Sequence, residues 1–172
     1  MGNWHGVTAL GAGAYPTAGQ LEVYSDFIAN AVDIFPRAKA TNEFRNNTTT
    51  LENDDDLFWE VVAGSYNFLI NNFYTAGTVP DVKFGWSYPS GTTIKWGGLS
   101  SDTAGAITIL GNRSESQTMI AAGSGTDLFC QFVGQVTVTT DGTLNYQWAQ
   151  NALEASNTTL YAGTHAYLIR IA

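Results

Sequence analysis

Short runs in which every second side chain is apolar recur along most of this chain, and they restrict its fold more than any other feature. The clearest run is Val82–Tyr88, whose four apolar residues would share one face of a strand. Similar runs return at intervals of about ten residues from residue 46 onward, separated by clusters of Gly, Asp, Asn, Pro and Ser. The pattern predicts an all-β domain.

The number of these runs indicates two packed sheets. Roughly eight to ten strands in a single sheet would leave an apolar face in water. We therefore predict an antiparallel two-sheet β-sandwich, with a jelly roll as the preferred topology and an immunoglobulin-like sandwich as the alternative. The single cysteine, Cys130, excludes the disulfide-pinned immunoglobulin form, and its apolar neighbours indicate a buried side chain.

Two further patterns place strands towards the C-terminus. Alternating runs on either side of Asp141-Gly142 predict a β-hairpin with a two-residue turn of positive φ. The run Tyr167–Ile171 predicts a paired last strand. Four tryptophans lie in alternating runs and are expected between the sheets: Trp59, Trp86, Trp96 and Trp148.

The first 45 residues differ in character. Residues 1–35 form a predicted N-terminal arm, Gly/Ala-rich at first, with a short amphipathic helix from Gln20 to Phe35 that Pro36 would end. Residues 36–45 form a predicted polar link that holds Arg37, Lys39 and Arg45. The sandwich domain would then span residues 46–172.

Apolar residues in the arm need a surface to pack on, either on the chain's own sandwich or on another subunit. An arm that packs on other subunits would attach the domain to a larger assembly. The candidate attachment residues are Trp4, Leu10, Tyr15, Leu21, Phe27, Ile28 and Val32.

The net charge restricts which partners the chain can bind, and the N-terminal sequence indicates where it is assembled. The chain has 15 acidic and 7 basic residues, a formal net charge of −8, which argues against nucleic acid and against an anionic membrane surface. The N-terminus lacks the basic start and apolar run of a signal peptide, so we expect assembly in the cytoplasm.

No residue pattern indicates catalysis, and we predict neither an enzyme nor a cofactor. Glu52–Asp56 is the densest acidic cluster, interpreted as a solvated turn; its weak candidates for a metal are Asp54, Asp55 and Asp56. His5 and His165 belong to no metal-binding or nucleophile–base pattern. A glycan-cleaving enzyme would need carboxylates that only folding could bring together, such as Asp81 and Asp127.

Residues 36–172 carry motifs that resemble a family of tailed-bacteriophage structural proteins. The motifs begin with Pro36-Arg37-Ala38 and the stretch from Thr48 to Leu57, and continue through Asp81–Trp86 and Pro89-Ser90-Gly91. They end with Gly142-Thr143-Leu144, Gln147–Asn151 and Ala162-Gly163-Thr164. The resemblance implies a virion protein of the head decoration or minor tail type.

From the resemblance and the arm together we expect a capsid decoration protein. Its partners would be the major capsid protein and itself, as a homotrimer, and it would act through protein–protein contacts. The alternative is a minor tail protein, a tail-tip or fibre module that binds host-surface glycan.

Overall fold

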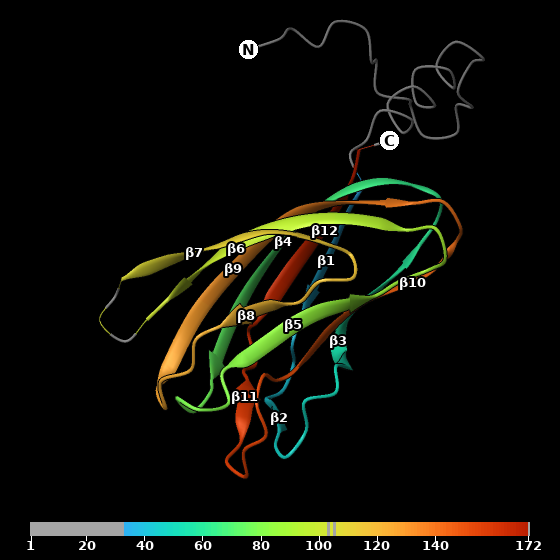
Figure 1. The fold of residues 1–172 in the computed structure, drawn as a ribbon. Coiled ribbons are helices and arrows are strands. Elements are labelled where there is room, and N and C mark those ends of the chain that lie inside the picture. The colour runs from blue at the N-terminus through green and yellow to red at the C-terminus, as the bar shows by residue number, and fades with distance from the viewer. Residues whose placement is uncertain (1–32, 103, 105, 172) are drawn as a thin grey trace, which may run out of the picture. The chain divides into compact units, whose positions relative to one another are not determined.

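The computed structural model describes residues 33–102, 104 and 106–171, and residues from 33 onward belong to one compact unit. Its described part is all-β, with twelve strands in two antiparallel sheets that face each other (Figure 1). This arrangement confirms the predicted β-sandwich. No helix in the described ranges is long and apolar enough to cross a membrane.

The two sheets differ in size. In the large sheet the main path runs β1 (Ile34–Ala38), β12 (His165–Arg170), β4 (Gly64–Thr75), β9 (Asp127–Val138), β6 (Thr93–Ser101) and β7 (Ile107–Ser114). Two short strands, β11 (Thr158–Leu160) and β2 (Glu43–Arg45), extend it beside β4. In the small sheet the order is β3 (Glu52–Val61), β10 (Gly142–Gln150), β5 (Val82–Ser87) and β8 (Met119–Ala121).

The strand pairing is that of a jelly roll. Strands β1, β3, β4 and β5 of the first half pair with β12, β10, β9 and β8 of the second half, in reverse order along the chain. Successive pairs alternate between the two sheets, as in a long hairpin that is wrapped around the core. The hairpin of β6 and β7 is an addition between β5 and β8 that widens the large sheet.

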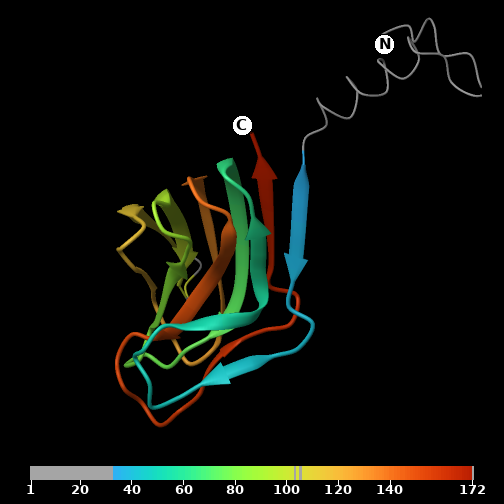
Figure 2. The ribbon, with the colours of Figure 1, turned by 90° about the vertical axis from the view of Figure 1, so that its right-hand side faces the viewer.

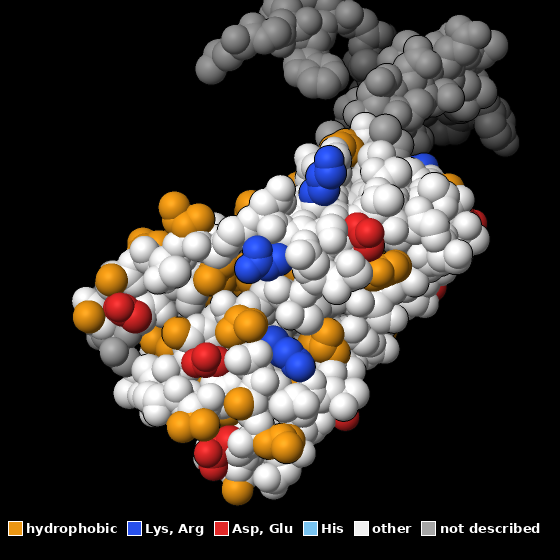
Figure 3. Space-filling model, viewed as in Figure 1, with side chains coloured by type: hydrophobic (Ala, Val, Ile, Leu, Met, Phe, Trp, Pro, Cys, Tyr) orange, Lys and Arg blue, Asp and Glu red, His pale blue; other side chains and the backbone are white. Residues whose placement is uncertain are grey.

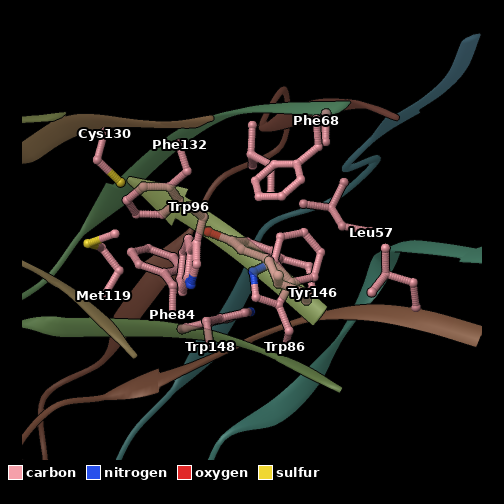
Figure 4. Packing of buried hydrophobic residues seen from close by; sticks show 14 of the residues in the cluster. Leu57, Phe68, Phe84, Trp86, Trp96, Met119, Cys130, Phe132, Tyr146 and Trp148 are labelled. Carbon is pink, nitrogen blue, oxygen red and sulfur yellow. The ribbon is translucent and has the colours of Figure 1, made fainter. Parts of the chain in front are cut away.

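Aromatic side chains from both sheets fill the space between them (Figure 4). Phe132 of the large sheet and Phe84 of the small sheet meet edge to face, with ring centroids 5.1 Å apart. Phe84 also stacks on Tyr146 at 5.6 Å. Cys130 and the four tryptophans predicted from the alternating runs are all buried, which confirms that part of the sequence analysis.

The predicted hairpin around Asp141-Gly142 is wrong. The strands on its two sides, β9 and β10, lie in different sheets and do not pair, so the connection crosses from one layer to the other. Asp141 accepts a hydrogen bond from the Ala63 backbone amide instead of closing a two-residue turn. The apolar residues on both sides are buried nonetheless, because they face the same core from opposite sheets.

The predicted boundary between arm, link and domain also changes. Residues 34–38, assigned to the end of a helix and the start of a link, form β1, which pairs with β12 (Figure 2). Residues 43–45 form β2. Pro36 is compatible with this arrangement because an edge strand tolerates a residue without an amide hydrogen. The rest of the predicted helix, residues 20–32, lies outside the described residues.

Candidate binding face and buried charge cluster

A cluster of charged side chains lies where β1, β2 and β3 come together. The Lys39 Nζ atom is 2.6 Å from Glu43 Oε2, 2.9 Å from Asp54 Oδ2 and 3.7 Å from Asp56 Oδ2. The side chains of Lys39 and Asp54 are almost fully buried. Since Lys39 follows a strand of the large sheet and Asp54 belongs to the small sheet, the ion pair ties the two layers together.

Arg45 extends the cluster towards the core. Its guanidinium lies over the ring of Trp148, 4.2 Å from the centroid, and pairs with Glu43 Oε1 at 2.5 Å. It also donates to the backbone carbonyls of Glu52, Asn53 and Trp148. These contacts use the planar, multi-donor geometry that only arginine offers, which makes Arg45 a structural residue.

Burial and pairing shift the pKa values of the cluster in opposite directions. Burial by itself would lower the pKa of Lys39, but the hydrogen bonds and charges of Glu43 and Asp54 together outweigh it and raise that pKa. Burial raises the pKa of Asp54, and Lys39 offsets only part of the rise. For Glu43, Lys39 and Arg45 outweigh burial, and its pKa is lowered.

The acidic segment Asp54–Asp56 is not the solvated turn that the sequence indicated. It forms an irregularity inside β3, where the pairing with β10 shifts register. The Asp54 Oδ1 atom accepts the backbone amides of Asp56 and Leu57, while its Oδ2 atom faces Lys39. Within the described ranges no group of three or more His, Cys, Asp or Glu side chains could hold a metal ion.

The other side chains that could in principle act in catalysis, Asp81, Asp127 and Cys130, do not interact with one another in the described hydrogen bonds. The Asp127 carboxylate accepts hydrogen bonds from Thr75 and Tyr161, at 2.7 and 2.8 Å, and these bonds lower its pKa. A general acid for glycan cleavage would need a raised pKa. Asp81 accepts the Gly123 amide, and burial raises the pKa of the Cys130 thiol, which disfavours the thiolate.

The outer face of the large sheet shows a different organisation. Along the paired strands β4 and β9, outward-facing residues alternate between apolar and amide pairs. The pairs in order are Phe73 with Phe129, Asn71 with Gln131, Leu69 with Val133, and Asn67 with Gln135. Consecutive pairs are two residues apart on each strand, which corresponds to a spacing of about 7 Å.

A chain of hydrogen bonds crosses three strands at the second of these pairs. Gln131 Nε2 donates to Asn71 Oδ1 at 2.7 Å, and Asn71 Nδ2 lies 2.9 Å from His165 Nε2. His165 Nδ1 lies 2.9 Å from the Gly163 carbonyl oxygen and must donate to it, so Nε2 is the acceptor for Asn71. The three side chains therefore hold one another in defined positions on the surface.

Aromatic rings form an arc beside the amides. Phe73 lies 5.5 Å from Phe129 and 6.3 Å from His165, and His165 lies 5.9 Å from Tyr167, between ring centroids. Phe73 is 40% exposed and Tyr167 is 38% exposed. We call the six residues Phe73, Phe129, Asn71, Gln131, His165 and Tyr167 the amide–aromatic face.

A shallow groove of about 430 Å³ adjoins this face where β9, β6 and β7 lie side by side. Gly97 and Gly111 form part of its floor, and Ile109, Val133 and Gln131 are among its lining residues. A Cβ atom on Gly97 would find no neighbour closer than 3.6 Å, so a methyl group would fit at this point of the groove without strain. Gln131 belongs to both the groove and the amide–aromatic face.

Outside the buried cluster, charged side chains are widely spaced on the surface that Figure 3 shows. There, on the side where β5 and β8 lie nearest the viewer, isolated basic and acidic residues lie among uncharged polar and apolar atoms. The rungs of β4 and β9 from residue 67 to 73 and from 129 to 135 contain no charged residue. A partner of this surface would therefore be recognised by shape, hydrogen bonds and apolar contact.

None of the candidate attachment residues can be placed, since Trp4, Leu10, Tyr15, Leu21, Phe27, Ile28 and Val32 all lie outside the described residues. Conversely, the amide–aromatic face was not predicted from the sequence. A local signal for part of it is the alternation of residues 67–73 and 129–135, in which amides and apolar residues occupy the outward positions.

No protein-family model matches the chain, and no curated protein matches it.

Proposed function

We propose that the protein is a non-catalytic structural subunit of a tailed-bacteriophage particle, a head decoration protein that binds the major capsid protein and other copies of itself. The observation that carries the proposal is where the ionisable groups lie. Lys39, Glu43 and Asp54 bind one another inside the domain, while the rungs of β4 and β9 from residue 67 to 73 and from 129 to 135, on the outer face of the large sheet, carry only uncharged polar and apolar side chains. This distribution suits a rigid body that binds by surface contact.

The folded domain and the N-terminal segment would have different roles in this function. The jelly roll would provide a stiff body, since aromatic residues from both sheets fill its core. Residues 1–32, with their apolar side chains, would provide attachment to neighbouring capsomers. Decoration by many copies would stabilise the shell by mass action. A protein that binds only the assembled head lowers the free energy of the head relative to that of its disassembled subunits.

The test compares the full chain with a variant that lacks residues 1–32. The cut precedes β1, because removing residues 34–38 would strip the domain of a strand that pairs with β12. Both proteins are titrated onto purified undecorated heads and measured by cosedimentation. The full chain should saturate the heads at a fixed copy number and raise their resistance to heat. The variant should remain folded, and its affinity for heads should be lower by a factor of about ten or more.

Two results would contradict the proposal at different points. Equal binding by both proteins would show that residues 1–32 are not the attachment segment. Failure of the full chain to bind heads at any concentration would overturn head decoration itself.

A further inference from the structure

We propose that the amide–aromatic face is a binding site for a neutral glycan. The proposal is independent of where on a particle the chain lies, since it concerns one face of the folded domain. It rests on the pairing of outward residues across β12, β4 and β9 and on the groove beside them.

The chemistry of a pyranose matches the two kinds of side chain on this face. One side of a sugar ring presents C–H groups, which pack well on an aromatic ring, and its rim presents hydroxyls that both donate and accept hydrogen bonds. Phe73 and Tyr167 offer partly exposed rings. Asn71 and Gln131 offer amides, which are donors and acceptors at once.

The amides are positioned before any ligand binds. Gln131, Asn71 and His165 form a continuous hydrogen-bond chain that ends on the Gly163 carbonyl. Among the described residues the Gln131 Oε1 atom has no hydrogen-bond donor, and it lies at the groove end of the chain. Side chains fixed in this way lose little conformational entropy when a ligand binds, which favours affinity.

The absence of charge selects the class of glycan. An anionic sugar would need a Lys or Arg near its carboxylate or sulfate. On this face Asp127 follows Phe129 along β9, Lys95 of β6 lies opposite Gln135, and Arg113 lies beside Gly111 at the groove. The rung that carries the amides, His165, Asn71, Gln131 and Leu99, holds no Lys, Arg, Asp or Glu. A neutral chain loses no charge solvation on this surface, so we assign a neutral hexose polymer or oligosaccharide as the ligand.

The groove suggests how a bound glycan chain would be oriented on the face. Its volume of about 430 Å³ is enough for one or two sugar units, and Gln131 joins it to the aromatic arc. A glycan chain would run across the strands, from the groove at Gly97 over Gln131 and Asn71 towards His165 and Tyr167.

The experiment exposes the full chain to an array of neutral and anionic oligosaccharides and measures the affinity for the best neutral binder by calorimetry. Two variants probe the face, Phe73→Ala and Gln131→Ala. Their controls are Phe58→Ala and Gln147→Ala on the small sheet, where Phe58 is 38% exposed and Gln147 donates to Asn53 as Gln131 does to Asn71.

We expect binding to at least one neutral oligosaccharide, a loss of about tenfold or more in each face variant, and unchanged affinity in both controls. Thermal unfolding checks the fold, and Gln131→Ala keeps the test valid if Phe73→Ala is destabilised. The inference is overturned if no neutral glycan binds, if only anionic glycans bind, or if face and control variants bind equally. A loss of head binding in the face variants without any glycan binding would also overturn it, and would mark the face as a protein interface.

Discussion

Lys39 is the residue on which the joint between the two sheets depends. Its ammonium neutralises Asp54, a carboxylate that the small sheet buries. Replacing Lys39 by Met would leave that carboxylate without its cation, and loss of one partner of a buried ion pair costs about 3–5 kcal/mol. Lys39→Met should therefore lower the free energy of unfolding by that amount in urea titrations.

A matched control for this prediction is Lys95→Met. Lys95 is an exposed lysine on a strand of the large sheet, and a surface substitution of this kind changes stability by about 0.5 kcal/mol or less. Similar losses in the two variants would show that the buried pair has no special role.

Glu43 makes the cluster sensitive to acid in a defined direction. Because its pKa in the folded chain lies below the ordinary value of 4.5, its contribution is complete above that pH and is lost as the pH falls through the folded pKa. The stability difference between the native chain and Glu43→Gln should be about 2 kcal/mol near neutrality and should shrink below pH 4.5.

This difference is the proper readout because Asp54, whose pKa is raised, shifts the total stability in the opposite sense. Burial is the main cause of the raised Asp54 pKa, and both proteins share it, so that part of the contribution cancels when urea denaturation is repeated across the acid range. A difference that stays constant down to the lowest pH at which the chain folds would argue against the ion pairs of Glu43.

Among the strands, β9 depends on a glycine in its middle. The alternating run that precedes Asp141-Gly142 is the second half of β9, which begins at Asp127 and runs through Gly134 without interruption. A Cβ atom at Gly134 would lie 2.5 Å from both the Lys95 carbonyl oxygen and the Phe68 Cζ atom. Gly134 thus allows the backbone of β6 and a core ring to approach β9 closely.

Gly134→Ala should accordingly lower stability by about 1–3 kcal/mol through overpacking. Gly97→Ala is the control, since its Cβ would meet only ordinary contacts and the substitution should be neutral or slightly stabilising. Thermal unfolding of the two variants distinguishes these outcomes, and equal melting temperatures would contradict the packing described around Gly134.

Strands that are recognisable from local alternation could be predicted, whereas features that depend on pairing between distant parts of the chain could not. The alternation in Val82–Tyr88 and the apolar run at the C-terminus correctly predicted β5 and β12, because burial on one face is visible locally. The turn residues Asp141-Gly142 predicted a hairpin that does not form, because local turn chemistry does not specify which sheet the next strand joins. Pro36 suggested a boundary, whereas pairing with β12 makes it part of β1.

For the molecule as a whole, the sandwich was predictable from the number and spacing of strands, but the candidate site was not. Asn71 and Gln131 are neighbours only through the register of β4 and β9, which are 60 residues apart in sequence at this point. The buried partner of Asp54 was equally invisible, because Lys39 was interpreted as part of a solvated link. Both features follow from long-range pairing, which a single sequence does not contain explicitly.

The central proposal, that the chain is a head decoration protein, is tested most directly by imaging purified particles assembled from the genome that encodes it. A reconstruction at a resolution that shows domains should reveal the jelly roll on the outer surface of the head, at symmetry-related positions between capsomers. Absence of the domain from the particle, or its presence only in the tail, would contradict the account.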